Sequence, residues 1–423
     1  MLGLSLGLGV LVRFSHLATI RTQIFDEVYF PVMANALLHG QLLFDVHPPL
    51  GKMLMALGIA AFGNNALGWR IVPAIGGVLL IALAAYTAWR NFSEEENPIV
   101  ATIAMVVLVG LDGAFIVYSR TGLMDGVLVL FTLAAYCLAL KATRRTIVAA
   151  AIVLGLAVSV KWVAAAVIVP MIYLLWRQKK LVDGVIYLPL AIASYLGVVL
   201  LGEGIGRVAN PVQAALNWHS QALMYHLTLK ATHPWSSKWW SWPFEFKPTL
   251  MYYQATTDHR IQVITSLGNP IAWWASTIAV LAAVVVVVCM VYKRQKSVLD
   301  HPLVPLLIGY FAAWIPFMTI QRVLFQYHFL TSYMFALLIL AYFLQRMWKH
   351  NAAGVVIILT TVIASAIFFL PFAIASPLTL EQIDQRVWVT SWLYTCAPED
   401  SNDHALQGIT QTLQQCIEWP KAK

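Results

Sequence analysis

Long apolar runs recur along this chain, and they constrain its fold more than any other feature of the sequence. A run of roughly 20 apolar residues can cross a bilayer as a helix, which leaves no backbone polar group unpaired in hydrocarbon. Eleven candidate spans lie at residues 1–20, 69–90, 98–118, 122–141, 146–160, 162–176, 184–202, 271–292, 302–320, 327–345 and 353–376. The two short runs, 146–160 and 162–176, could form one bent element, so the count carries an uncertainty of about two. The pattern predicts an all-α polytopic membrane protein.

Composition excludes the main soluble alternatives. Hydrophobic residues make up 60% of the 423 positions and charged residues only 11%, which is too little charge to cover a soluble surface of that size. The net charge of +8 would suit a nucleic-acid partner, but the basic residues stand in short clusters between apolar runs, as they do at the ends of membrane helices. We therefore expect membrane lipid around this chain and no nucleic acid as a partner.

The basic residues also predict an orientation. If the N-terminus is cytoplasmic and the spans alternate, the inside loops carry basic clusters and the short outside connections carry single basic residues, as the positive-inside rule requires. The inside clusters comprise Arg90, Lys141, Arg144, Arg145, Arg177, Lys179, Lys180, Lys293, Arg294, Lys296, Arg346 and Lys349. Two long loops, 21–68 and 203–270, then lie together on the non-cytoplasmic side.

These spans and loops predict one membrane domain over residues 1–376 and a non-cytoplasmic tail over 377–423. Cys396 and Cys416 lie in that tail, where an oxidising compartment would allow a disulfide between them. Two free thiols are the alternative.

The first long loop contains two segments that are apolar at helical spacing, 28–38 and 50–62. Both are too short to span a bilayer, so they predict amphipathic helices in the outer interface. Asp26 and Glu27 open this loop, either as a helix cap with a first-turn acid or as a catalytic pair. Farther along, Asp45, His47 and Lys52 surround a rigid Pro-Pro turn, which suits side chains that must be held in place.

Single charges stand at the outer ends of several spans, where they are costly unless paired or functional. They are Arg13, Arg70, Arg120, Asp125, Lys161, Arg322 and His328. Surface anchors and structural ion pairs, such as Arg120 with Asp125, are one interpretation. The other is a cluster of cations just below the headgroups that binds a lipid-linked phosphate.

Aromatic and histidine residues are concentrated in the second long loop, at Trp218-His219, Tyr225-His226 and 233–243. Most of the tryptophans fit an aromatic belt at the membrane interface. The rings would also stack on sugars or prenyl chains, so the loop is a candidate cover for a donor site. The histidine pairs lack the spacing of metal ligands, and we expect no metal site.

Several motifs occur in one order over most of the chain: FDEVYF, FDVHPPLGK, GWR, SRTGLMD, VSVKW, HPWSSKWWSWP, LGNP and RVLFQYH. With these motifs the sequence closely resembles the bacterial protein O-mannosyltransferases, family GT39. The resemblance implies a GT-C glycosyltransferase fold in the cell inner (plasma) membrane, with the active site on the periplasmic or extracytoplasmic face. It implies transfer of mannose, with inversion, from a polyprenyl-phosphate donor to Ser or Thr hydroxyls of exported or membrane proteins. It implies no required cofactor or metal, and the secretion machinery is a further candidate partner.

The resemblance also assigns roles to single residues. It places the catalytic acids at Asp26 and Glu27, and matches Arg70 and Arg13 to arginines of the family. Asp26 would take the proton of the acceptor hydroxyl, while the phosphate leaves as an anion without a general acid. The predicted donor phosphate-binding residues are Arg70, Arg322, Lys161 and Arg13, and the predicted sugar or acceptor contacts are Asp45, His47, Tyr327, His328 and Trp239.

Two alternatives stay open at this stage. A related GT-C transferase could move another lipid-linked sugar to a lipid or glycan, although aminoarabinose transferases carry Lys where this chain has His47. A transporter is disfavoured because its intramembrane charges would lie near the midplane of broken, repeated helices.

Overall fold

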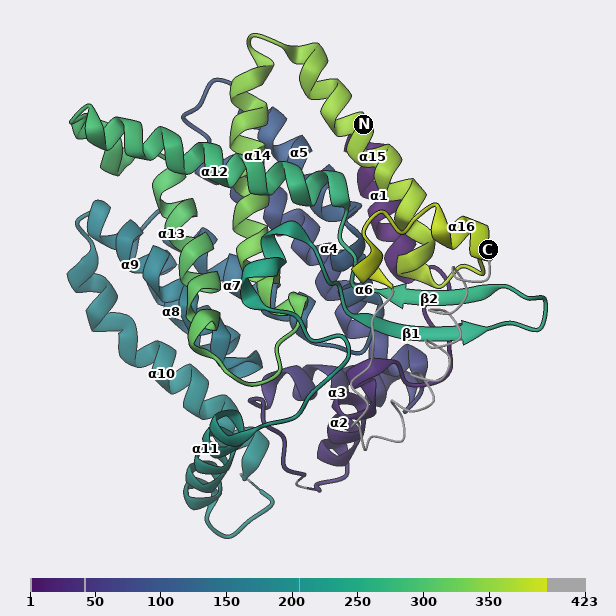
Figure 1. The fold of residues 1–423 in the computed structure, drawn as a ribbon. Coiled ribbons are helices and arrows are strands. Elements are labelled where there is room, and N and C mark those ends of the chain that lie inside the picture. Colours follow the sequence, from purple (N-terminus) through teal and green to yellow (C-terminus); the bar gives the residue numbers. More distant parts are fainter. Residues whose placement is uncertain (1, 42, 205, 394–423) are drawn as a thin grey trace.

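The computed structural model describes residues 2–41, 43–204 and 206–393, and it is mostly helical (Figure 1). Within these residues five helices are long and apolar enough to cross a membrane, and the pair α5 and α6, bent by 57°, makes a sixth. The long helices are α4 (Ala66–Asn91), α10 (Leu181–Glu203), α12 (Pro270–Tyr292), α14 (Leu330–Trp348, extended by the turn from Gln326) and α15 (Ala352–Ile374). The bent pair is α5 (Pro98–Gly110) and α6 (Gly113–Arg120).

Shorter apolar helices account for the other predicted spans. They are α1 (Leu2–Phe14), α7 (Asp125–Ala139), α8 (Arg144–Val160), α9 (Ile168–Arg177) and α13 (Leu303–Trp314). Each of the eleven predicted spans therefore contains a helix, and the two short runs form separate helices that break at Lys161. The multi-pass helical fold is confirmed, whereas the number of crossings stays a prediction because five or six helices meet the length criterion.

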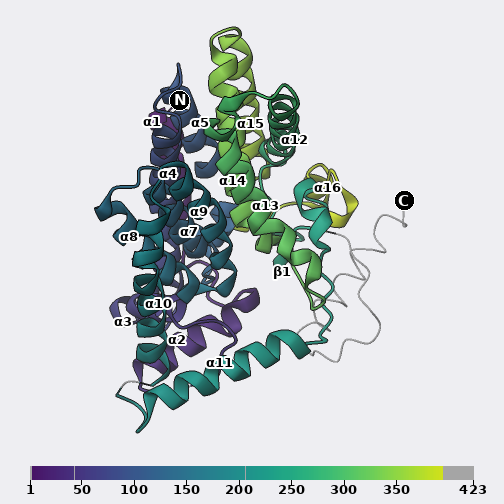
Figure 2. The same cartoon turned by 90° about the vertical axis from the view of Figure 1, so that its left-hand side faces the viewer.

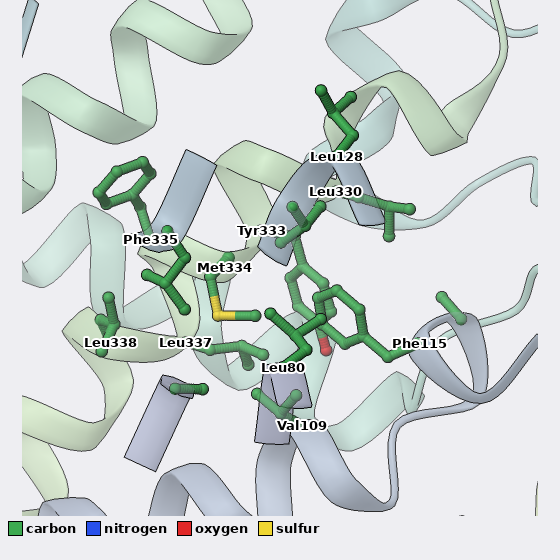
Figure 3. Packing of buried hydrophobic residues seen from close by; sticks show 14 of the residues in the cluster. Leu80, Val109, Phe115, Leu128, Leu330, Tyr333, Met334, Phe335, Leu337 and Leu338 are labelled. Carbon is green, nitrogen blue, oxygen red and sulfur yellow. The ribbon is translucent and has the colours of Figure 1, made fainter. Parts of the chain in front are cut away.

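Helix α14 lies in the centre of the packed helices. Figure 3 shows its residues Tyr333, Met334 and Leu337 beside labelled side chains of α4, α5 and α6, and the Tyr333 ring stacks on Phe115 at 5.8 Å. By contrast, only 17% of the most apolar window of α10 is buried inside the protein. Because an apolar helix that is this exposed needs an apolar solvent, α10 is expected to face lipid.

The first long loop forms the helices that the sequence predicts. It contains the short 3-10 helix η1 (Phe25–Val28), then α2 (Phe30–Leu38) and α3 (Leu50–Phe62). Helix α3 crosses α4 at close range, since a Cβ added to Gly58 would lie 2.4 Å from the carbonyl oxygen of Gly68. This contact needs glycine, and it sets the first turn of α4, which carries Arg70.

The second long loop contains strands that the all-α prediction did not include. After α11 (Pro211–Thr228) and η3 (Trp239–Phe244), strands β1 (Leu250–Ala255) and β2 (Ile261–Thr265) form an antiparallel hairpin. An isolated hairpin is only marginally stable, and this one is held by an isolated bridge from Ile261 to Leu378 and by packing on α15.

The two long loops meet at one end of the molecule. Figure 2 shows α11 running across that end, next to α2 and α3. The indole Nε1 of Trp218 donates to the carbonyl of Asp45 at 2.7 Å, which joins α11 to the Pro-Pro turn. The chain then continues through α16 (Leu380–Asp384) to residue 393, so the predicted pair Cys396 and Cys416 lies outside the described residues.

Candidate active site

The acidic pair at the start of the first loop splits into two different environments. Glu27 is fully buried, and Arg70 donates Nε to its Oε1 at 2.8 Å and Nη2 to its Oε2 at 2.7 Å. The backbone N–H groups of Ile24 and Gly122 donate to the same carboxylate. Glu27 is thus saturated by its neighbours and is not placed to exchange a proton with a substrate.

Arg70 is saturated as well. Its remaining N–H groups donate to the carbonyls of Leu17, Ile20 and Thr22, at 3.2, 2.7 and 3.1 Å. All five donors of the guanidinium are therefore used within the protein. The geometry argues against the predicted phosphate contact of Arg70 and the predicted catalytic contact of Glu27, and instead gives the pair a positioning role for the segment that leads to Asp26.

Two further arginines turn inward rather than toward a ligand. Arg13 is fully buried and donates to the carbonyls of Gly9, Val109 and Gly110 and to Ser119. It joins α1 to the bend between α5 and α6, which argues against the predicted phosphate contact. Arg120 donates to the carbonyls of Val12 and Ser15 at the end of α1. The prediction that Arg120 pairs with Asp125 is wrong, because a helix end attracts Arg120 and Asp125 has another partner.

That partner is Lys161. Its Nζ contacts both carboxylate oxygens of Asp125, at 2.8 and 2.9 Å, and both side chains are almost completely buried. Lys161 stands at the break between α8 and η2 (Trp162–Val167), where the backbone turns extended, and Asp125 opens α7. The helix break therefore puts this cation beside the start of a neighbouring helix, which no spacing in the sequence indicates.

The Lys161–Asp125 pair lines a cavity of about 280 Å³. The polar side chains around it are His47, Asp125, Lys161, His226, Arg322, Tyr327, His328 and Thr331. They come from the Pro-Pro turn, α7, the break between α8 and η2, α11, the segment before α14 and the start of α14. The structure thus brings together five predicted site residues from distant parts of the chain, and adds Asp125 and His226.

Asp26 lies beside this cluster. It is half-buried, and among the described residues no group donates a hydrogen bond to its carboxylate. Burial raises the pKa of Asp26 to about 6; Lys161 opposes the rise, while the negative charges of Asp125 and Asp45 add to it. A carboxylate with this pKa is ionised at neutral pH yet is a stronger base than an ordinary aspartate.

The Pro-Pro turn holds its own polar residues in place. Lys52 Nζ contacts Asp45 at 2.8 Å and donates to the carbonyl of His47 at 3.0 Å, and both Lys52 and Asp45 are buried. The His47 ring stacks on Phe30 and faces the cavity. Burial and the nearby cations, Lys161 first, lower the pKa of His47, so its imidazole is neutral. Asp45 is therefore placed to shape the turn, and His47 is the residue of this turn whose ring lines the cavity.

Arg322 differs from every cation described so far. It is half-buried and lines the cavity, yet within the described part of the chain it has neither a carboxylate partner nor a hydrogen bond. A guanidinium without a partner is costly near hydrocarbon unless an anion binds there. Among the predicted cations, Arg322 is the one that the structure leaves available for a phosphate.

Comparison with known proteins decides the family. Residues 4–188 match the family model of the dolichyl-phosphate-mannose-protein mannosyltransferases, and residues 212–392 match the C-terminal four-transmembrane region of protein-O-mannosyltransferase. The chain belongs to the protein O-mannosyltransferase family. A polyprenol-phosphate-mannose–protein mannosyltransferase of Mycobacterium tuberculosis is 26% identical over 92% of this chain and 91% of its own length. The corresponding protein of Corynebacterium glutamicum is 24% identical over 82% of this chain and 81% of its own length.

Solved structures place this mannosyltransferase in the GT-C fold. The Saccharomyces cerevisiae protein O-mannosyltransferase Pmt1–Pmt2 complex bound to the sugar donor superposes with a TM-score of 0.78 at 15% identity, over 92% of both chains. ArnT from Cupriavidus metallidurans bound to undecaprenyl phosphate gives 0.56 at 16% identity, over 87% of this chain and 64% of that one. At such identities the likeness concerns the fold alone.

An apolar cavity of about 810 Å³ adjoins the polar one in the mannosyltransferase. The two cavities share Trp162, Val163 and Ile320 in their walls. The larger one is lined by η2, α9, α12 and α13 and carries no charged residue in its lining. A polar compartment thus continues directly into an apolar one, which is the arrangement that a phosphate on a long hydrocarbon chain requires.

The remaining predicted residues take different places. Tyr327 and His328 line the polar cavity, and their rings stack at 4.6 Å. Trp239 packs instead on Trp314, with ring centres 5.4 Å apart, and is not among the residues that line this cavity. No group of three or more metal-ligating side chains occurs in the described part of the mannosyltransferase. Sequence reasoning missed Asp125 as the partner of Lys161, and the only available signal was its position at the start of a span.

Proposed function

We propose that this mannosyltransferase moves mannose from a polyprenyl-phosphate donor to Ser or Thr hydroxyls of exported or membrane proteins, with inversion at the anomeric carbon. Family membership makes the chain an enzyme that transfers mannose to proteins. The observation that carries the finer proposal is the position of Asp26 beside a cavity that continues into an apolar cavity and contains Arg322, which has no partner among the described residues. The names of the Mycobacterium tuberculosis and Corynebacterium glutamicum relatives also support a polyprenyl-phosphate donor.

In this proposal the donor spans both cavities. Its phosphate contacts the guanidinium of Arg322, its hydrocarbon chain follows the apolar cavity, and its sugar extends toward Asp26. The Lys161–Asp125 pair is nearly neutral as a whole, so Arg322 supplies the main positive charge for the phosphate. His47, Tyr327 and His328 would then contact the sugar or the acceptor.

The chemistry needs one base and one cation. The acceptor hydroxyl oxygen attacks the anomeric carbon as its proton passes to Asp26, and the bond from that carbon to the phosphate oxygen breaks. The electron pair stays on the phosphate, which leaves as a polyprenyl monophosphate and needs no general acid because its second pKa is about 6. A single carboxylate suffices, unlike the two carboxylates of ordinary glycosidases.

The proposal places the reaction on the extracytoplasmic face of the plasma membrane. The clusters of basic residues between the spans favour this orientation, and acceptors that have crossed the membrane would meet the enzyme there. The two long loops that surround Asp26 and Arg322 would then face the same compartment as those acceptors.

Transfer should depend on pH through Asp26. The base acts only when it is ionised, so kcat/KM should stay constant above about pH 7 and fall about tenfold per unit below pH 6, since the pKa of Asp26 is about 6. Initial rates with a polyprenyl-phosphate mannose donor and an acceptor peptide, measured between pH 4.5 and 8, would show this profile. Constant rates down to pH 4.5 would mean that Asp26 is not the base.

The proposed function is tested most directly at the phosphate contact. Replacing Arg322 by Gln should lower kcat/KM about 10- to 100-fold, because the leaving phosphate loses a cation that has no other partner among the described residues, in a partly screened site. Arg260→Gln is the matched control, since Arg260 is exposed on the hairpin and pairs with Asp258. Mass spectrometry of the acceptor peptide would identify the added hexose. If the wild-type protein added no hexose to the peptide, or if Arg322→Gln and Arg260→Gln had the same kcat/KM, the assignment of the donor would be wrong.

A further inference from the structure

His226 is a residue of the polar cavity to which nothing so far assigns a role. It lies in the last turns of α11, and its Nε2 is 3.1 Å from the carbonyl oxygen of Val46, at the Pro-Pro turn. A carbonyl only accepts, so the proton of the neutral ring must be on Nε2. The ring therefore forms a link between the second loop and the first.

The other ring nitrogen, Nδ1, differs from Nε2 in its surroundings. His226 Nδ1 is buried, and within the described residues nothing bonds to it. With the proton on Nε2, Nδ1 carries a lone pair and can only accept a hydrogen bond. A buried acceptor without a donor is costly, and such atoms in native proteins call for an explanation such as a ligand.

His219 on the same helix shows what a purely structural histidine looks like here. Its Nδ1 bonds the carbonyl of Ala215 at 2.7 Å and its Nε2 bonds the Tyr195 hydroxyl, also at 2.7 Å. Both nitrogens are therefore satisfied within the protein, and His219 does not line the polar cavity. The contrast sets His226 apart as the histidine of α11 with an open position.

The environment of His226 favours the neutral ring, in which Nδ1 is a hydrogen-bond acceptor. Burial, and next the charge of Arg322, lower the pKa of His226, which favours the neutral ring. His47 lies 5.9 Å away between ring centres, and Trp162 lies 5.7 Å away, edge to face. His226 thus lines a compartment that also contains Arg322, Lys161 and an aromatic wall, which suits a sugar next to a phosphate.

We propose that His226 positions the transferred sugar, with Nδ1 accepting a hydrogen bond from one hydroxyl of the hexose on the polyprenyl-phosphate donor. The inference rests on the proposed function, because it takes that donor to occupy the polar cavity. His226 would hold α11 against Val46 through Nε2 and would hold the sugar through Nδ1. It would therefore keep the second loop over a correctly bound hexose and discriminate among sugars.

The test compares donors that each lack one sugar hydroxyl with the intact polyprenyl-phosphate mannose. Wild-type enzyme should transfer one of these analogues with kcat/KM about tenfold lower than the intact donor, the usual loss for one hydrogen bond with a neutral acceptor. His226→Gln can still donate an amide N–H toward Val46 but lacks the acceptor at the Nδ1 position. It should transfer that analogue and the intact donor at equal kcat/KM, whereas the matched control His219→Gln should keep the tenfold preference.

Each comparison is a ratio within one sample, so a smaller folded fraction in a variant does not alter it. If His226→Gln keeps the tenfold preference and loses activity equally on all donors, His226 only links the loops and the inference is wrong. If the wild-type enzyme discriminates against no analogue, the inference is likewise wrong while the proposed function stands. If the wild-type enzyme transfers no mannose from the intact donor, the proposed function fails, and the inference fails with it.

Discussion

Asp26→Asn should lower kcat for mannose transfer about a thousandfold, within the range for loss of a general base. The amide has nearly the shape of the carboxylate but cannot accept the hydroxyl proton. The structure makes this a clean substitution, because no group of the described chain donates a hydrogen bond to the Asp26 carboxylate and no internal contact is lost. The rate is measured with purified protein in nanodiscs, polyprenyl-phosphate mannose and an acceptor peptide.

Two controls separate lost chemistry from lost structure. The Asp26→Asn protein should bind the donor as tightly as the wild type, since Arg322 and both cavities are unchanged. Asp258→Asn, at an exposed turn of the hairpin, should retain normal activity. Asp26→Glu should recover part of the rate, because it restores a carboxylate at a slightly different position. Near-normal transfer by Asp26→Asn would rule out Asp26 as the base.

Arg70→Met should lower the free energy of unfolding by about 3–5 kcal/mol, the cost of leaving a buried carboxylate without its cation. Glu27 would lose two hydrogen bonds, and three backbone carbonyls of the segment before Asp26 would lose their donor. Because that segment positions Asp26, activity should fall together with stability. Denaturation in mixed detergent micelles, followed by tryptophan fluorescence, gives the free energy.

The matched control is a salt bridge at the surface. Arg346 contacts Glu95 at 3.2 Å, with the arginine more than half exposed, so Arg346→Met should cost no more than about 1 kcal/mol. The double variant Glu27→Leu with Arg70→Met should be more stable than Arg70→Met alone, since the double variant leaves neither charge of this pair buried without the other. Equal losses for Arg70→Met and Arg346→Met would show that the buried pair does not organise the loop.

Much of the fold was predictable because a membrane imposes a simple rule on sequence. Every predicted span contains a helix, and 50–62 forms the predicted helix α3. The hairpin β1–β2 was not predicted, because its strands depend on Leu378 and α15, which lie far along the chain from both strands. Local pattern contains no information about such partners.

The sequence predicted which residues belong to the candidate site, but not which of their charged side chains pair with one another. Lys161 and Arg322 were identified as single charges near the outer ends of apolar runs, and Asp26 as the first acid of the first long loop. Lys161 and Arg322 line one cavity, and Asp26 lies beside it. The prediction that Asp125 pairs with Arg120 was wrong, because its partner is Lys161. Arg13 and Arg70 donate hydrogen bonds to backbone carbonyls. A charge near hydrocarbon must find a partner, but the sequence does not say which one.

By itself, the sequence determined that this chain is a membrane protein, where its helices lie along the chain, and which family its motifs indicate. These features follow from the sequence because the length of an apolar run and the order of motifs can be read directly along the chain. Only the tertiary structure decided which charges neutralise one another and which remain available. Glu27 pairs with Arg70 and Asp125 pairs with Lys161, whereas in the part of the chain that the structure describes the side chains of Asp26 and Arg322 have no such partner. The physical reason is that pairing depends on distances of about 3 Å between side chains from different helices, and helix packing alone sets those distances.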